Sequence, residues 1–251
     1  MKKFVLAVIF VFALCQAAFS EVITVFAAAS MQASIEKISA LYKQVNQDIE
    51  IICNFDSSGT LKTQIEEGAE CDLFISAAQK QMNALDKAGL IDSSTRINLL
   101  ENKVVLVVPE GNPAKIESFN DLAGEKLNLI ALGNSDVPVG AYSQEILTNM
   151  GIWEKLNADK KISFASNVTE VAMQVRESVV DCGIIYATDA ATHKLTVVAE
   201  PPAGTLKTPV IYPAAIIRGS KHESQAKKFL EFLQSSPAAE IFASIGFSLA
   251  K

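Results

Sequence analysis

The stretch VITVFAAAS, from Val22 to Ser30, predicts a β-strand that runs into three alanines and ends on a serine. A helical pattern begins directly after it, so the hydroxyl of Ser30 can cap the next helix. The alanines are small enough to let another group approach the backbone. Because a helix N-terminus has unpaired N–H donors and a positive potential, this junction favours an anion.

The same order of strand, small polar turn and helix follows twice more. Asp48 to Phe55 predicts a buried strand before the turn DSSGT at Asp56 to Thr60, and Asp72 to Ser76 predicts a third strand before another helix. Three such units indicate a parallel sheet with right-handed crossovers. Ligands of such sheets bind beyond the carboxyl ends of the strands, where Ser30 and Ser58 both fall.

The second half of the chain predicts another α/β lobe. Lys103 to Pro109 is an apolar strand that we interpret as the crossing into it, and Val210 to Ile217 is the strand that returns. We therefore predict that residues 21–104 and 207–251 form lobe 1 and that residues 105–206 form lobe 2.

Residues 1–20 predict a signal peptide that takes no part in either lobe. Lys2 and Lys3 precede an apolar run, and small residues stand at Ala18 and Ser20, the two positions that signal peptidase reads. The protein is therefore expected in the periplasm.

The cysteines indicate neither a metal site nor a redox motif. Cys15 lies within the predicted signal peptide and suggests a lipid anchor, but Leu14 stands where a lipobox usually has a small residue. The other cysteines are Cys53, Cys71 and Cys182, an odd number without CxxC spacing, which favours buried free thiols over a disulfide framework.

Charge and motifs exclude several classes of function. The formal net charge of −6 argues against a nucleic-acid partner or an anionic membrane surface. The only histidines are His193 and His222, both in polar contexts, and no HExxH, GxSxG, P-loop or GxGxxG motif is present. We predict that the protein is not an enzyme and has no cofactor.

Hydroxyls and bare backbone N–H groups recur where a helix follows a strand. Besides Ser30 and Ser58, such junctions lie at Val137 to Gly140 and at Asn167 to Val168. Each alone is typical of an ordinary cap or turn. Together, across two lobes, they would form an anion site without a charged side chain. Tyr186 ends a strand and could donate its phenol to this site or lie on its rim.

In their order and spacing, the motifs at these junctions resemble the periplasmic molybdate-binding proteins of ABC importers, the ModA family. The resemblance covers nearly the whole chain after residue 20. It rests on VFAAAS (25–30), FDSSGTL (55–61), CDLFISA (71–77), VPVGAY (137–142), GIIY (183–186) and AAEIF (238–242).

The resemblance implies a type II periplasmic-binding-protein fold, with two α/β lobes joined by a two-strand hinge. It implies high-affinity capture of molybdate or tungstate, delivery to an ABC transporter membrane permease, and a monomer. Metal would be bound only as the oxyanion. The ligand-binding residues carried over by motif are the hydroxyls of Ser30 and Ser58, the backbone N–H groups of Val139 and Val168, and the phenol of Tyr186.

Two positions depart from the family pattern. Cys71 stands where proline is common, and Asp56 places a carboxylate beside the serine turn where a small residue is usual. Since a carboxylate facing a dianion would weaken binding, we expect Asp56 to turn outward or to cap its own helix. The alternative is the same fold with another anion, such as sulfate, a phosphonate or an organic anion.

Overall fold

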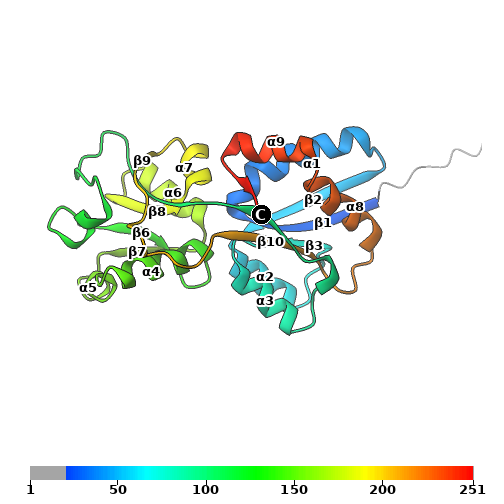
Figure 1. Ribbon diagram of the computed structural model, residues 1–251, viewed down its shortest axis with the longest axis horizontal. Helices are drawn as coiled ribbons and strands as arrows, with labels where there is room; N and C mark the ends of the chain where they lie inside the picture. Colours follow the sequence, from blue (N-terminus) through cyan, green and yellow to red (C-terminus); the bar gives the residue numbers. More distant parts are fainter. Residues whose placement is uncertain (1–20, 251) are drawn as a thin grey trace, which may run out of the picture.

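The computed structural model describes residues 21–250 as two α/β lobes side by side (Figure 1). The predicted signal peptide at 1–20, with Cys15, lies outside the described residues. No helix within the described range is both long and apolar enough to cross a membrane.

Lobe 1 is built on a mixed six-stranded sheet. Its order is β11 (Ser248–Leu249), β4 (Ile97–Glu101), β10 (Ile211–Ile216), β3 (Leu73–Ile75), β1 (Glu21–Ala28) and β2 (Ile49–Asp56). The first three strands along the chain are mutually parallel, as predicted, whereas β10 is antiparallel to both β3 and β4. The carboxyl ends of β1, β2 and β3 therefore meet at one edge.

Helices cover both faces of this sheet (Figure 1). One face has the 3₁₀ turn η1 (Ala29–Met31), α1 (Gln32–Val45), α8 (Glu223–Leu233) and α9 (Ser236–Ile245); the other has α2 (Ser58–Glu66) and α3 (Gln79–Lys87). The apolar stripe of α1 packs on the sheet through Ile35, Ile38 and Tyr42, which are all buried.

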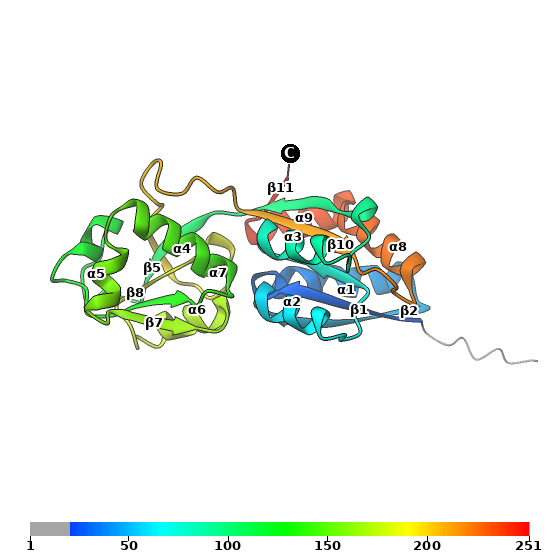
Figure 2. The same cartoon turned by 90° about the horizontal axis from the view of Figure 1, so that it is seen from below.

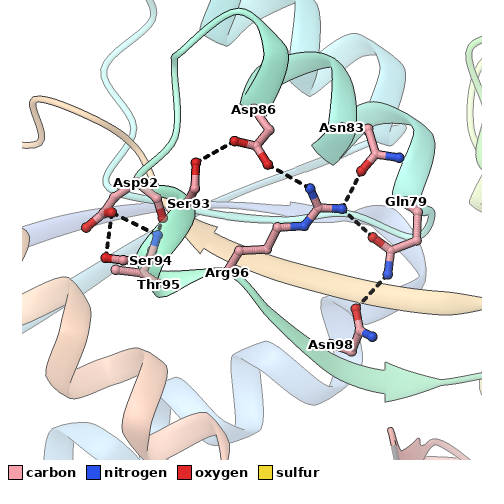
Figure 3. A network of polar contacts seen from close by, with 9 residues as sticks. All are labelled: Gln79, Asn83, Asp86, Asp92, Ser93, Ser94, Thr95, Arg96 and Asn98. Carbon is pink, nitrogen blue, oxygen red and sulfur yellow. Dashed lines mark hydrogen bonds and ion pairs between the residues drawn. The ribbon is translucent and has the colours of Figure 1, made fainter.

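A polar network fixes α3 beside β4 and the short turn η2 (Ser93–Thr95) (Figure 3). The Arg96 guanidinium donates to Asp86 Oδ2 at 3.0 Å and to Gln79 Oε1 at 2.6 Å, and Gln79 Nε2 donates to Asn98 Oδ1. This outer side of lobe 1 is therefore held by charge-assisted bonds in addition to apolar packing.

Lobe 2 is built on a five-stranded sheet with helices on both faces (Figure 1). Its order is β7 (Ile162–Ala165), β6 (Ile130–Gly133), β8 (Cys182–Tyr186), β5 (Val104–Val108) and β9 (Thr196–Ala199). The helical elements are η3 (Phe119–Ala123), α4 (Pro138–Asn149), α5 (Trp153–Ala158), α6 (Val168–Arg176) and α7 (Ala187–Thr192). Every residue of β5 is buried, which explains its unbroken apolar sequence.

Two segments connect the sheets, and both run along the same side of the molecule (Figure 2). One is the short link between β4 and β5, and the other lies between β9 and β10. The backbone N–H of Asn102 in the first donates to the carbonyl of Val210 in the second at 3.1 Å. The lobe boundaries at 104/105 and 206/207 stay a prediction, although each falls at or beside one of these links.

Candidate ligand-binding site

A small cavity lies between the lobes, at the starts of several helices. The cavity is small, because the centre of a water-sized sphere has about 10 Å³ in which to move there. The lobes are in contact beside it, since Asn167 Nδ2 of lobe 2 donates to Asp56 Oδ1 of lobe 1 at 3.4 Å. Its walls are Ala28, Ala29, Ser30, Asp56, Ser57, Ser58 and Ala77 from lobe 1, with Val137, Pro138, Val168 and Tyr186 from lobe 2.

Ser30 reaches the cavity from η1, directly after β1. Its side chain is buried, and its Oγ lies 2.9 Å from the phenol oxygen of Tyr212 on β10. The hydroxyl of Ser30 makes no cap hydrogen bond to the following helix. The prediction of a capping role is therefore wrong, and the hydroxyl is held by the buried tyrosine behind it.

Ser58 is fully buried at the first position of α2. The cap of α2 is Ser57, whose Oγ accepts from the N–H of Thr60 at 3.1 Å. Ser58 Oγ accepts instead from the backbone N–H of Ala77 at 2.9 Å. The adjacent serines thus divide two tasks, since Ser57 completes the helix and Ser58 faces the cavity.

Ala77 is a lining residue that the sequence analysis did not name as a site residue. It follows β3 and brings a backbone N–H to the same strand edge as Ser30 and Ser58. The sequence signal was present in CDLFISA, where a small residue follows a predicted strand, but a backbone donor leaves no side-chain signature.

Val168 is the first residue of α6, and its cap is Asn167, whose side chain accepts from the N–H of Glu170 at 3.0 Å. The N–H groups of a first helical turn have no partner within the helix. Val168 therefore brings a backbone donor and the positive end of α6 to the cavity from lobe 2.

Tyr186 is 1% exposed, so it is an interior residue and not a rim residue. Its hydroxyl is buried without a hydrogen-bond partner among residues 21–250. Burial raises the pKa of this phenol well above its ordinary value, and the nearby Tyr212 and Tyr142 add to the effect. The hydroxyl thus keeps its proton and is a free donor at the cavity.

The structure does not place Val139 on the cavity. Helix α4 begins at Pro138, because proline fits the first turn of a helix. Val139 is consequently inside that turn, fully buried, and its carbonyl accepts from Ser143 Oγ at 2.7 Å. The wall of the cavity here is Val137 and Pro138.

Asp56 lies on the cavity wall and neither turns outward nor caps α2. Its Oδ1 accepts from the N–H of Ser57 at 2.7 Å and from Asn167 Nδ2, across the lobes, at 3.4 Å. That oxygen is already satisfied by donors from both lobes. No lysine, arginine or histidine lines the cavity, so its positive potential comes from helix starts and N–H groups.

A second direct contact joins the lobes beside the cavity. The N–H of Gly59 in α2 donates to the carbonyl of Asp136 in lobe 2 at 3.1 Å. A Cβ at Gly59 would lie 2.2 Å from that carbonyl oxygen. The closed arrangement therefore requires glycine at this position.

A larger cleft, of about 330 Å³, lies elsewhere in lobe 1. Several of its polar side chains contact one another: Lys221 Nζ lies 2.9 Å from Glu70, and His222 Nδ1 lies 3.5 Å from Asp72. Both of its walls belong to lobe 1, so lobe closure cannot enclose a ligand there. No group of three or more potential metal ligands occurs in the described part of the chain.

The cysteines among residues 21–250 are free thiols. Burial raises the pKa of Cys53 to about 11 and that of Cys71 to about 12, so both are protonated at neutral pH. Cys182 is also buried.

Residues 23–248 match the sequence model of a family described as bacterial extracellular solute-binding protein. The chain belongs to this family. It is 38% identical over 237 residues to the molybdate-binding protein ModA of Escherichia coli strain K12, covering 90% of this chain and 89% of that protein. It is 39% identical over 228 residues to YvgL of Bacillus subtilis strain 168, provisionally named an ABC transporter substrate-binding lipoprotein, covering 90% of this chain and 86% of YvgL.

Among solved structures, the periplasmic molybdate-binding protein of Azotobacter vinelandii superposes with a TM-score of 0.81 at 22% identity, covering 91% of this chain and all of that one. The predicted two-lobe periplasmic-binding-protein fold and the family resemblance are thereby confirmed. The protein is an extracellular solute-binding protein and not an enzyme.

Proposed function

We propose that this protein captures molybdate or tungstate outside the cytoplasm and delivers it to the membrane permease of an ABC importer. The observation behind this proposal is the closed cavity between the lobes, whose polar groups are mainly hydrogen-bond donors and which has no cationic side chain. The ligand-binding groups would be the hydroxyls of Ser30, Ser58 and Tyr186 and the N–H of Val168. The similarity to ModA of Escherichia coli supports the choice of anion.

The energetics of such a cavity suit a dianion. Removing a doubly charged ion from water is costly unless protein hydrogen bonds replace its hydration. Hydrogen bonds to a charged group contribute about 1.5–3 kcal/mol each. The starts of α2, α4 and α6 border the cavity and add positive potential from both lobes. Opening and closing of the lobes would admit and enclose the ion.

The same groups discriminate between tetrahedral anions. Hydrogen phosphate has a proton that requires an acceptor, whereas the hydroxyl oxygens of Ser30 and Ser58 are already engaged with Tyr212 and with the N–H of Ala77. Sulfate has the charge and shape of molybdate but shorter bonds, so it would reach fewer donors at once. Molybdate and tungstate are too similar for this cavity to separate by charge or shape.

Calorimetric titration of residues 21–251 with molybdate, tungstate, sulfate and phosphate tests the proposal. We expect binding of molybdate and tungstate with a Kd of about 1 μM or tighter, which corresponds to about −8 kcal/mol. Sulfate and phosphate should bind at least about 100-fold more weakly, a difference of about 2.7 kcal/mol. Tight binding of sulfate or phosphate with none of molybdate would refute it and favour the alternative anion.

The remaining predictions concern the whole protein. We propose that residues 21–104 with 207–251 and residues 105–206 move as two lobes about the two connecting segments, and that the protein is a monomer. Small-angle scattering tests both ideas in one series. The mass should be that of a single chain, and the radius of gyration should decrease when molybdate is added.

A further inference from the structure

A chain of hydrogen bonds lies behind Ser30, on the side away from the cavity. Ser30 Oγ lies 2.9 Å from the phenol oxygen of Tyr212, and Asn102 Nδ2 lies 3.1 Å from that same oxygen. Asn102 Nδ2 also donates to Thr188 Oγ1 in α7 at 2.9 Å. Tyr212 is fully buried, and none of Tyr212, Asn102 and Thr188 lines the cavity.

This hydrogen-bond network joins the two connecting segments and both lobes. Tyr212 lies on β10, which enters lobe 1 from the second connecting segment, and Asn102 lies in the first connecting segment. Thr188 belongs to lobe 2. A single polar network thus links the site serine of lobe 1 to both connections and to the opposite lobe.

One direction of these hydrogen bonds gives the donors of the network acceptors within it. The backbone N–H of Lys103 donates to Asn102 Oδ1 at 2.8 Å, which fixes the orientation of the amide. Both hydrogens of Asn102 Nδ2 are then directed at Tyr212 and Thr188, so the phenol oxygen is an acceptor from Asn102. The phenol hydrogen of Tyr212 has Ser30 Oγ as its acceptor. In this direction the phenol hydrogen of the fully buried Tyr212 has an acceptor, which avoids the cost of an unsatisfied polar group.

Since Ser30 Oγ accepts from Tyr212, the single hydroxyl hydrogen of Ser30 is free to point into the cavity. Ser58 is held in the same way, because its Oγ accepts from the N–H of Ala77. We propose that Tyr212 and Asn102 are positioning residues that hold Ser30 as a donor, and that they thereby favour fully deprotonated oxyanions over protonated ones. This inference rests on the proposed function and names residues that determine its specificity.

The physical reason is that a serine hydroxyl can both donate and accept. Without the phenol behind it, Ser30 can rotate, donate elsewhere and present a lone pair to the ligand. A lone pair suits the proton of hydrogen phosphate but repels the oxygens of molybdate. Loss of the phenol hydroxyl should consequently weaken molybdate binding more than phosphate binding.

A double-mutant cycle measured by calorimetry at pH 8 tests the inference. The proteins are the unaltered chain, Tyr212→Phe, Ser30→Ala and the double variant, titrated with molybdate and with phosphate. Tyr212→Phe should lower molybdate affinity about tenfold when Ser30 is present, the equivalent of one charge-assisted hydrogen bond. In the Ser30→Ala background the same substitution should change affinity less than about twofold. The ratio of molybdate affinity to phosphate affinity should decrease on Tyr212→Phe only when Ser30 is present.

Tyr142→Phe is the matched control. This tyrosine is also buried, and its hydroxyl lies 3.4 Å from the carbonyl of Pro209, away from Ser30. Its substitution should leave both affinities unchanged. Asn102→Asp is a second variant that keeps the shape of the side chain. Its carboxylate would accept from the phenol of Tyr212, so molybdate affinity should fall at least as far as in Tyr212→Phe. In the Ser30→Ala background, Asn102→Asp should lower molybdate affinity by a smaller factor.

Two outcomes overturn the inference while leaving the proposed function intact. One is unchanged molybdate affinity in Tyr212→Phe, and the other is an equal loss with and without Ser30, which would indicate a merely structural role. Failure of the unaltered protein to bind molybdate or tungstate overturns the proposed function instead. If another anion of the panel binds, the same cycle with that anion decides whether Tyr212 acts through Ser30.

Discussion

Tyr186 has a buried hydroxyl that no group within residues 21–250 satisfies. A buried polar group without a partner costs about 1–3 kcal/mol of stability. Ser30 and Ser58 differ in this respect, because each oxygen has a partner behind it. At the scale of single residues, the site therefore combines two oriented donors with one that is unsatisfied until a ligand arrives.

Tyr186→Phe should separate stability from binding. Removing the unsatisfied hydroxyl should raise the free energy of unfolding by about 1 kcal/mol and lower molybdate affinity by about tenfold. Chemical denaturation and calorimetry measure the two effects. A variant that is less stable than the parent would show that the hydroxyl has a structural partner after all.

The adjacent serines of α2 give a second test. Ser58→Ala should lower molybdate affinity by about 1–3 kcal/mol, because it removes a donor to the ion. Ser57→Ala removes the cap of α2 and should instead lower the free energy of unfolding by about 1 kcal/mol. Equal losses of affinity in both variants would contradict the division of tasks between them.

Asp189, the neighbour of Thr188 in α7, predicts a pH dependence of stability. Burial raises the pKa of this carboxyl to about 7, partly opposed by its bond to Thr188. Between the ordinary pKa of about 4 and pH 7, the unfolded chain releases this proton and the folded protein keeps it. The stabilisation that this protonated carboxyl contributes to the folded state is therefore at its full value below about pH 4. It is lost as the pH rises from about 4 through 7.

Asp189→Asn should remove that dependence. Thermal unfolding of the variant and the parent between pH 4 and pH 8 should show a gap that grows in favour of the variant as the pH rises. A constant difference between the two proteins over this range would mean that the carboxyl is not protonated in the folded state.

At the scale of elements, the sequence predicted best where local signals agree. Strands β1 to β3 are parallel, as their alternation with helices indicated. Helix α4 begins within the junction predicted at Val137 to Gly140, although its proline and glycine are also typical of a loop. Strand β4 was missed, since INLLE alternates weakly and forms a strand through its pairing with β10 and β11.

The contact between Gly59 of α2 and Asp136 of lobe 2 predicts a steric test. Because a Cβ at Gly59 would meet the carbonyl oxygen of Asp136, Gly59→Ala should hold the lobes apart. Molybdate affinity should fall about tenfold or more, while the melting temperature of the ligand-free variant stays within about 2 °C of the parent. Affinity equal to that of the parent would mean that this contact is not made in the ligand-bound form.

At the scale of the whole molecule, the site lies where two sheets on separate lobes present helix starts to each other. Four residues predicted from the sequence line the cavity, since each ends a strand or begins a helix within a short motif: Ser30, Ser58, Val168 and Tyr186. Their binding of a ligand stays a prediction. The network behind Ser30 could not be predicted, because Tyr212 lies 182 positions away along the chain and reaches Ser30 only through the fold. Val139 stays a prediction as a ligand-binding residue, because it lies in the first turn of α4 but does not line the cavity.

The central claim is that an oxyanion is enclosed between the lobes by Ser30, Ser58, Val168 and Tyr186. The most direct measurement is a crystal structure of the protein with molybdate, with anomalous diffraction recorded at the molybdenum edge. We expect one molybdenum peak in this cavity, with oxygens within about 3 Å of those hydroxyls and of the Val168 nitrogen. A peak in the cleft between Glu70 and His222, or none at saturating molybdate, would contradict it.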